Sequence, residues 1–253
     1  MINQSSEPSI NQRFRAFLFL RNMNLPFFFV EELNDKQIAL DENTSRHMIN
    51  VLRMQRGDEI LLTDGKGKKA KASIVDDHRK KTVVEISLIE TNEKRQNKTV
   101  IGISLIKNSS RFEWFLEKAT EIGVSEIIPL ICTRTEKEKF RHDRMQNILM
   151  SAMLQSQQYW LPLLHEPTSF DDVLQLPIDQ KFIAHCEDSN KQPLSSHQRS
   201  STSKLILIGP EGDFTPEEIE AAFKNNFIPV SLGNTRLRTE TAAIVAATVL
   251  CVY

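Results

Sequence analysis

Residues 205–214 read Leu-Ile-Leu-Ile-Gly-Pro-Glu-Gly-Asp-Phe, and residues 230–233 read Val-Ser-Leu-Gly. Each apolar run ends at a glycine, Gly209 in the first and Gly233 in the second. Bare backbone at the ends of adjacent buried strands is how open α/β sheets hold small ligands. The pattern therefore predicts a ligand site at these strand ends, although tight turns alone would account for the glycines equally well.

The patterns around this stretch predict an α/β domain over residues 98–253. Apolar runs typical of buried strands alternate with segments of helical periodicity. Strands are expected at 100–106, 127–131, 182–186, 205–208 and 228–232, and helices over 112–122, around 145–153, from 215 onward and over 242–250. Ser110 with Glu113 and Thr215 with Glu218 fit the capping-box pattern of helix N-termini. Such alternation indicates a mostly parallel sheet with helices on both faces.

Residues 23–93 show a different pattern, which predicts a small β-barrel. Short strands are expected at 27–30, 59–63, 71–75 and 82–89, and a turn at 64–67. A helix is expected over 45–53, with Met48, Val51 and Leu52 on one face. Residues 1–22 lack a helix cap and a sustained periodicity, so we expect them to be a dispensable or mis-assigned extension.

The composition is that of an ordinary soluble globular protein, with 253 residues, 40% hydrophobic and 26% charged, and a net charge of -1. Cys132, Cys186 and Cys251 lie far apart without a Cys-x-x-Cys motif, which argues against a disulfide framework and a zinc site. We therefore expect a cytoplasmic protein without a metal site. No run approaches the roughly 18 apolar residues of a membrane span.

The common nucleotide and hydrolase signatures are missing from the sequence. It contains no Gly-x-x-x-x-Gly-Lys-Ser/Thr, so a P-loop ATPase is disfavoured, and no Gly-x-Gly-x-x-Gly follows a strand as in dinucleotide-binding domains. It also lacks the Gly-x-Ser-x-Gly motif of α/β-hydrolases. If the two glycines hold a ligand rather than only form tight turns, the ligand is recognised by some other arrangement.

Two motifs together resemble those of the SPOUT-class RNA methyltransferases. The first is Gly-Pro-Glu-Gly-x-Phe at 209–214, and the second is Leu-Gly-x-x-x-Leu-Arg-Thr-Glu-Thr-Ala at 232–242. The sequence from Met23 onward is most similar to the family that methylates N3 of a uridine in small-subunit (16S) ribosomal RNA. The resemblance implies a PUA-like RNA-binding β-barrel, then an α/β domain with a deep trefoil knot. It also implies S-adenosylmethionine as the methyl donor and a homodimer.

The resemblance further implies where the cofactor and the reaction are placed. The cofactor-binding residues it implies are Ile208, Gly209, Gly212, Leu232, Gly233, Leu237, Thr239 and Ala242. The uridine nitrogen must lose a proton during methyl transfer, so the site needs a charge stabiliser and a proton acceptor. Arg238 is the candidate for the first role, and Glu211 and Glu240 are candidates for the second. Either carboxylate would also suit the N-terminus of the last helix.

Basic residues in segments similar to the family's are candidates for binding RNA phosphates, with solvated surface charge as the alternative. They are Arg46, Arg53, Lys66, Lys68, Lys69, Lys107, Arg111, Arg134 and Arg144. The chain departs from the family's pattern at Gln157 and Gln158, where the family has Gly-Arg, and at Asp213, where it has glycine. An alternative function is an RNA-binding ribosome-assembly factor that has kept the fold and lost methyl transfer.

Overall fold

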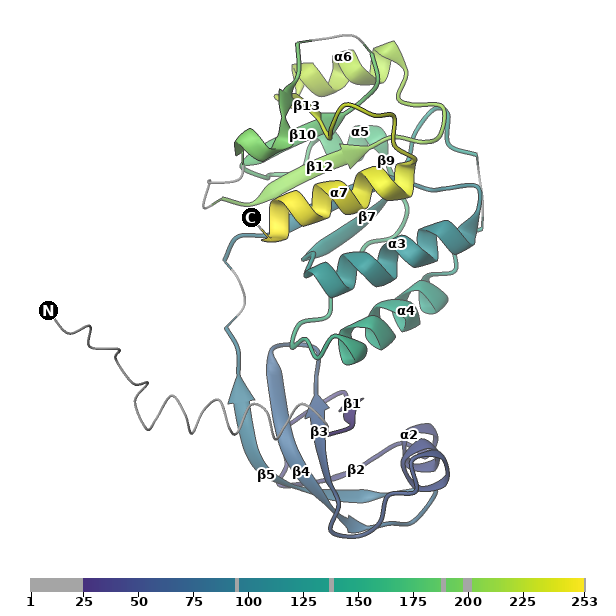
Figure 1. Ribbon diagram of the computed structural model, residues 1–253, viewed down its shortest axis with the longest axis vertical. Coiled ribbons are helices and arrows are strands. Elements are labelled where there is room, and N and C mark those ends of the chain that lie inside the picture. Colours follow the sequence, from purple (N-terminus) through teal and green to yellow (C-terminus); the bar gives the residue numbers. More distant parts are fainter. Residues whose placement is uncertain (1–24, 94–95, 137–138, 188–189, 198–201, 253) are drawn as a thin grey trace, which may run out of the picture. The chain divides into compact units, whose positions relative to one another are not determined.

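The computed structural model describes residues 25–93, 96–136, 139–187, 190–197 and 202–252. They divide into two compact units, with the boundary between Asn92 and Glu93. Figure 1 shows the helices and strands of each unit. The expected extension, residues 1–22, lies outside the described part of the chain. No helix within that part has both the length and the apolar character needed to cross a membrane.

The first unit is built on a five-stranded sheet in the order β1-β3-β4-β5-β2. Its strands are β1 (Phe27–Phe29), β2 (Gln37–Ala39), β3 (Glu59–Thr63), β4 (Lys68–Asp76) and β5 (Val83–Thr91). The pair β1 and β3 is parallel and the other pairs are antiparallel. The sheet curls on itself, so that Phe28 of one edge strand and Ile38 of the other pack into the same core. The four predicted strands are confirmed, and β2 was not predicted.

The prediction of one α-helix over 45–53 is wrong, because the segment is only partly α-helical. A short helix α2 (Glu42–Arg46) continues into a π-helical turn, η1 (His47–Val51), in which Leu52 N–H donates to the carbonyl of His47 at 3.0 Å. The wider turn rotates successive side chains away from α-helical spacing. Met48 is therefore buried while Val51 and Leu52 are 65% and 42% exposed, and the three do not share one face.

The second unit contains a parallel sheet in the order β11-β13-β10-β12-β6-β7-β8, with β9 also paired to β7. The strands are β6 (Thr99–Ser104), β7 (Glu126–Ile131), β8 (Leu163–Leu164), β9 (Thr168–Ser169), β10 (Gln180–Ala184), β11 (Gln192–Pro193), β12 (Lys204–Ile208) and β13 (Ile228–Ser231). All five predicted strands of this unit are confirmed. The strand order departs from the chain order, and β10 lies between β12 and β13.

Helices cover both faces of this sheet, as the alternation of patterns predicted (Figure 1). On one face lie α3 (Ser109–Ile122), α4 (His142–Gln155) and α7 (Thr239–Val252), which share a core with Ile101 and Ile103. On the other lie α5 (Phe170–Leu174) and α6 (Pro216–Lys224), whose core includes Val100. A 3-10 turn, η2 (Leu194–His197), completes the described elements. Because consecutive residues of β6 face opposite cores, its four central residues, 100–103, are all apolar.

The two predicted capping boxes have different outcomes. Thr215 and Glu218 form the expected box at the start of α6. At α3, in contrast, Asn108 is the capping residue, and its side chain accepts from Ser110 N–H at 3.0 Å. Because α3 begins one residue before Ser110, the predicted box of Ser110 and Glu113 is wrong.

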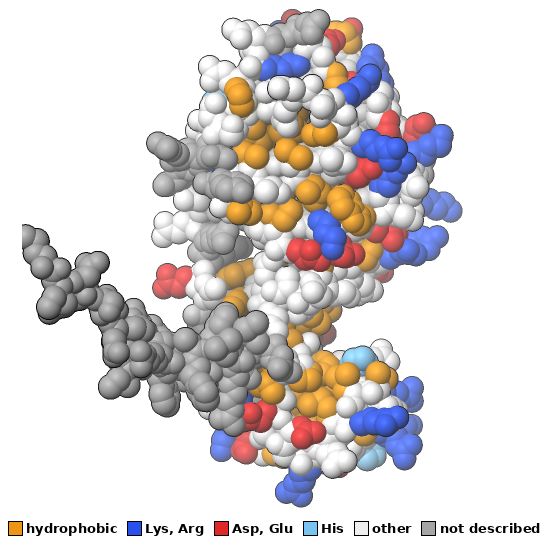
Figure 2. Space-filling model, viewed as in Figure 1, with side chains coloured by type: hydrophobic (Ala, Val, Ile, Leu, Met, Phe, Trp, Pro, Cys, Tyr) orange, Lys and Arg blue, Asp and Glu red, His pale blue; other side chains and the backbone are white. Residues whose placement is uncertain are grey.

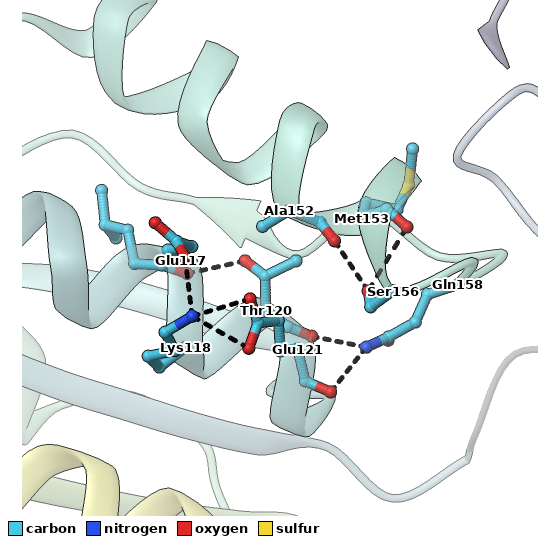
Figure 3. Close-up of polar contacts among 9 residues, drawn as sticks. Glu117, Lys118, Thr120, Glu121, Ala152, Met153, Ser156 and Gln158 are labelled. Carbon is cyan, nitrogen blue, oxygen red and sulfur yellow. Dashed lines mark hydrogen bonds and ion pairs between the residues drawn. The ribbon is translucent and has the colours of Figure 1, made fainter. Parts of the chain in front are cut away.

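The C-terminus of α4 explains the departure at Gln157 and Gln158. Gln157 N–H donates to Leu154 O at 3.2 Å and Gln158 N–H to Met153 O at 3.0 Å, the paired bonds of a Schellman motif. Gln157 takes a φ of 54°, the left-handed conformation that the motif needs. Figure 3 shows the Gln158 amide donating to the C-terminal carbonyls of α3, Thr120 O at 2.6 Å and Glu121 O at 2.9 Å. Both residues therefore serve helix termination here.

Replacing Gln157 with glycine is expected to stabilise the protein by about 0.5–1 kcal/mol. A side chain in the left-handed region costs roughly 1–2 kcal/mol, and the greater freedom of glycine in the unfolded chain offsets part of the gain. We expect the melting temperature to rise by about 1–4 °C in thermal unfolding followed by circular dichroism. The matched control is Gln175→Gly, because Gln175 has a φ of -85° and should lose stability. Equal shifts in both variants would contradict the strain argument.

Candidate active site

Three neighbouring parallel strands end together at one edge of the second unit's sheet. Ala184, the last residue of β10, pairs with Ile208 of β12 on one side and Val230 of β13 on the other. The segments that follow all leave the sheet at this edge. The register therefore brings the two predicted glycine segments together, with the end of β10 between them.

A cavity of about 900 Å³ lies at this edge, within the range of about 300–1,000 Å³ that is usual for small-ligand sites. Ten of the residues predicted as functional line it. They are Ile208, Gly209, Glu211, Leu232, Gly233, Leu237, Arg238, Thr239, Ala242 and Arg111. The sequence did not predict the remaining lining residues, which are Ala184, His185, Cys186, Lys191, Pro210, Asp213, Val230, Ser231, Asn234, Thr235 and Arg236.

The two glycines of the motifs need to be glycine for different reasons. A Cβ on Gly209 would lie 3.1 Å from two ring atoms of Phe214 and 3.2 Å from its backbone nitrogen. Gly233 has a φ of 135°, which side-chain-bearing residues rarely adopt, and a Cβ there would enter open space. Gly209 therefore allows Phe214 to pack closely against the strand end, and Gly233 leaves exposed backbone in the wall of the cavity. These walls fit a cofactor that is held by backbone amide and carbonyl groups.

Gly212, in contrast, does not line the cavity. A Cβ at this position would meet only the side chain of Arg134, at 3.4 Å. Arg134 is a predicted RNA-binding residue, but its guanidinium donates to Gly212 O at 2.7 Å and Phe214 O at 3.3 Å. Arg134 and Gly212 therefore both help to hold the loop between β12 and α6.

Asp213 occupies the position at which the family's pattern has glycine. It has a φ of 65°, so it keeps the backbone conformation that glycine favours. Its carboxylate accepts from Phe214 N–H at 2.9 Å and from Cys186 N–H at 2.7 Å. The aspartate therefore joins the loop after β12 to the loop after β10, and both loops line the cavity.

The N-terminus of α7 closes another part of the wall. Thr239 Oγ donates to the carbonyl of Gly209 at 3.0 Å, so it links the two motifs directly. Arg238 is exposed and immediately precedes α7, whose Ala242 N–H donates to Arg238 O at 2.8 Å. Glu240 is buried, does not line the cavity, and lies 3.7 Å from Arg111 Nε. Among the candidate proton acceptors, only Glu211 reaches the cavity.

The other predicted RNA-binding residues lie on two separate units. On the second unit, Lys107 pairs with Glu136 at 2.9 Å and Arg144 with Glu113 at 2.9 Å. On the first, Lys66 Nζ donates to Glu31 O and Lys68 Nζ to Asn34 Oδ1, while Arg46 pairs with Glu42. Lys66 lies in the predicted turn, and Lys68 and Lys69 follow it. Arg53 is an exposed residue with a φ of 56°.

His185 is the lining residue with the most unusual surroundings. It is buried, and neither ring nitrogen has a hydrogen-bond partner among the described residues. Burial lowers the pKa of this imidazole, and Lys191 lowers it further, while Asp213 acts in the opposite direction. The ring is therefore neutral near neutral pH. Within the described part of the chain, no cluster of three or more His, Cys, Asp or Glu residues is arranged to hold a metal ion.

Comparisons with known proteins agree with this architecture. The chain matches the model of the RNA methyltransferase domain over residues 92–251 and that of the RNA methyltransferase PUA domain over residues 40–87. Ribosomal RNA small subunit methyltransferase E of Bacillus subtilis is 32% identical, over 79% of this chain and 84% of its own length.

Solved structures extend the likeness to the fold of most of the chain. A probable rRNA-methyltransferase from Porphyromonas gingivalis has a TM-score of 0.83 at 36% identity, covering 88% of this chain and 95% of its own. A second structure is that of ribosomal RNA small subunit methyltransferase E from Neisseria gonorrhoeae bound to S-adenosyl methionine. It has a TM-score of 0.80 at 29% identity, covering 88% of this chain and 95% of its own.

Proposed function

Since this chain belongs to the ribosomal RNA small subunit methyltransferase E family, we propose that it methylates N3 of a uridine in 16S ribosomal RNA, with S-adenosylmethionine as the methyl donor. The observation that carries the proposal is the cavity at the ends of β10, β12 and β13. Its wall contains the backbone of Gly209 and Gly233, the two positions at which the motifs and the geometry both call for glycine.

The cofactor would be held by the backbone of the two glycine segments. Bound there, S-adenosylmethionine supplies a methyl group on a positively charged sulfur, which a nucleophile can attack in line. The amides and carbonyls around Leu232, Gly233 and Leu237 suit the edge of an adenine ring in a partly apolar slot. Thr239 keeps the Gly209 segment in place through its hydrogen bond to the Gly209 carbonyl. Ile208 and Ala242 add apolar wall.

Arg238 and Glu211 would carry out the chemistry on the base. The N3 atom becomes a good nucleophile when its proton leaves, and the charge then spreads over the two neighbouring carbonyl oxygens. A guanidinium at the rim of the cavity stabilises that charge, and Arg238 is placed there. Glu211 is the proton acceptor in this scheme. Glu240 would orient Arg111 through their ion pair rather than take the proton.

The RNA would be bound by both units, which we propose as an RNA-binding domain over 23–93 and a knotted methyltransferase domain over 98–253. In the first domain, Arg46, Arg53, Lys66, Lys68 and Lys69 are the proposed contacts to phosphate. In the second, Lys107, Arg111 and Arg144 are proposed, whereas Arg134 would act on the RNA only through the loop it supports. Such contacts make binding strongly dependent on salt.

We also propose that the protein is a cytoplasmic homodimer. Helix α7 has apolar residues around most of its circumference, and six of its 14 residues are buried within one chain. Figure 2 shows hydrophobic side chains gathered on the face of the second unit where α7 lies. Ile244 and Val249 are partly buried, and Val252 is 58% exposed. A helix that is apolar all round is normally buried, and a second copy would cover it.

The proposed function is tested by methylating small ribosomal subunits from a strain that lacks this gene. Purified protein and labelled S-adenosylmethionine should transfer one methyl group to one uridine, which mass spectrometry of the RNA fragments would locate. Methylation at N3 blocks base pairing, so reverse transcription should stop at the same nucleotide. Binding of ribosomal RNA without any affinity for the cofactor or its demethylated product would instead favour the assembly factor.

A further inference from the structure

The loop after β12 carries a charged side chain at a position whose backbone favours glycine. Asp213 ends a turn in which its N–H donates to the carbonyl of Pro210 at 2.9 Å, and its φ of 65° lies in the left-handed region. A side chain costs free energy in that conformation. The aspartate is therefore favoured over glycine only if its carboxylate makes contacts that compensate.

The carboxylate of Asp213 joins two loops of the cavity wall. One oxygen accepts from the N–H of Phe214 at 2.9 Å, and because Phe214 is 1% exposed, this bond fixes the carboxylate beside the core. The other oxygen accepts from the N–H of Cys186, in the loop after β10, at 2.7 Å. Hydrogen bonds to an ionised carboxylate are stronger than those between neutral groups. Glycine at position 213 would leave the two loops without this link.

A second charged side chain holds the same part of the loop after β10. Lys191 Nζ donates to the carbonyl of His185 at 2.7 Å and also to the carbonyl of Glu187. Residues 185–187 belong to no helix or strand. Their main-chain groups are therefore held by an aspartate on one side and a lysine on the other, rather than by the sheet.

We propose that Asp213 is a positioning residue for the cofactor, whose carboxylate holds the segment 185–187 in the cavity wall before the cofactor binds. The inference rests on the proposed function and gives the aspartate no contact with the reacting atoms. Ala184 pairs with both β12 and β13, so the segment leaves the sheet between the strands that lead to Gly209 and Gly233. His185 and Cys186 line the same cavity as the two glycines.

A wall that is already ordered binds a ligand more tightly than a wall that the ligand must order. Ordering a loop consumes part of the interaction free energy, so a bond that holds the loop beforehand raises the affinity without a new contact. The coupling is reciprocal, and the bound ligand must stabilise the Asp213–Cys186 hydrogen bond in turn. Because this bond acts on the cofactor site, its loss should raise the KM for S-adenosylmethionine and leave kcat nearly unchanged.

The test compares Asp213→Gly with Asp213→Asn, since both residues tolerate the left-handed conformation. Isothermal titration calorimetry should show S-adenosylhomocysteine binding about tenfold more weakly to Asp213→Gly, or about 1.4 kcal/mol. Asp213→Asn keeps one acceptor oxygen and should lose only about threefold. In methyl-transfer assays the KM for S-adenosylmethionine should rise by the same factors. The control is Asn226→Gly, because Asn226 has a φ of 64° and lies outside the cavity lining.

Hydrogen exchange followed by NMR separates positioning from a general loosening of the domain. The Cys186 amide should exchange about tenfold faster in Asp213→Gly than in the wild type, as loss of one hydrogen bond of this strength implies. The amides of β12 should keep their wild-type rates. Saturating the wild type with S-adenosylhomocysteine should slow the exchange of the Cys186 amide.

The outcomes separate this proposal from the function on which it rests. Wild-type affinity and KM in Asp213→Gly, or unchanged exchange at Cys186, would overturn the positioning role and leave the methyltransferase proposal standing. A loss of kcat as large as the loss of affinity, with faster exchange throughout β12, would do the same, because the substitution would then have loosened the whole domain. Failure of the wild type to bind S-adenosylhomocysteine would overturn both.

Discussion

Replacing Gly209 with valine is expected to weaken the binding of S-adenosylhomocysteine at least about 100-fold, or about 2.7 kcal/mol. A Cβ at this position already falls within 3.1 Å of the Phe214 ring and 3.2 Å of the Phe214 backbone nitrogen. Phe214 is 1% exposed and its N–H donates to Asp213, so neither contact can give way freely. Valine must therefore displace Phe214 and, with it, the loop after β12, whose Pro210, Glu211 and Asp213 line the cavity.

Calorimetric titration of the variant measures this loss, and circular dichroism checks that the fold persists. Gly212→Ala is the matched control in the same loop, because its Cβ would meet only Arg134 at 3.4 Å and would lie outside the cavity. Its affinity should stay within about threefold of the wild type. If Gly212→Ala lost as much affinity as Gly209→Val, the cofactor would be held by the loop in a different way from the one described above.

The strands of the second unit could be predicted because each is a short apolar run bounded by polar residues or glycine. The predicted run 205–208 differs from the observed β12 only by the addition of Lys204. The short edge strand β2 was missed, because Gln37–Ala39 has only one apolar side chain directed at a core. The π-helical turn was also missed, since its sequence has ordinary helical spacing and only the hydrogen bond from Leu52 to His47 reveals it.

The glycine segments of the site could be predicted, whereas its centre could not. Gly209 and Gly233 stand at the ends of recognisable strands, so their local sequence carries the signal. His185 becomes part of the site only because β10 lies between β12 and β13, and nothing local to residue 185 shows that order. The unpredicted strand order also explains the loop contact from Asp213 to Cys186 N–H, which spans 27 residues of sequence.

Replacing Arg238 with alanine is expected to lower the rate of methyl transfer about 10²- to 10³-fold, as removal of one preorganised charge stabiliser does in other enzymes. The guanidinium lines the cavity and makes no hydrogen bond or ion pair that would hold it elsewhere among the described residues. It is therefore available to the uridine when the N3 proton leaves. Single-turnover assays with saturating cofactor and ribosomal subunits would measure the loss, and Arg238→Lys should recover part of the rate.

The pH dependence of the variant separates charge stabilisation from simple RNA binding. Without Arg238 the base ionises less readily, so the rate of Arg238→Ala should keep rising at pH values where the wild type has become constant. An arginine that only binds phosphate would change the RNA concentration needed for half-maximal rate and leave the shape of the pH profile unaltered. Lys224→Ala is the control, because Lys224 is an exposed cation of α6 that pairs with Glu220. If the pH profile of Arg238→Ala had the same shape as that of the wild type, Arg238 would act only in RNA binding and would not stabilise the charge on the base.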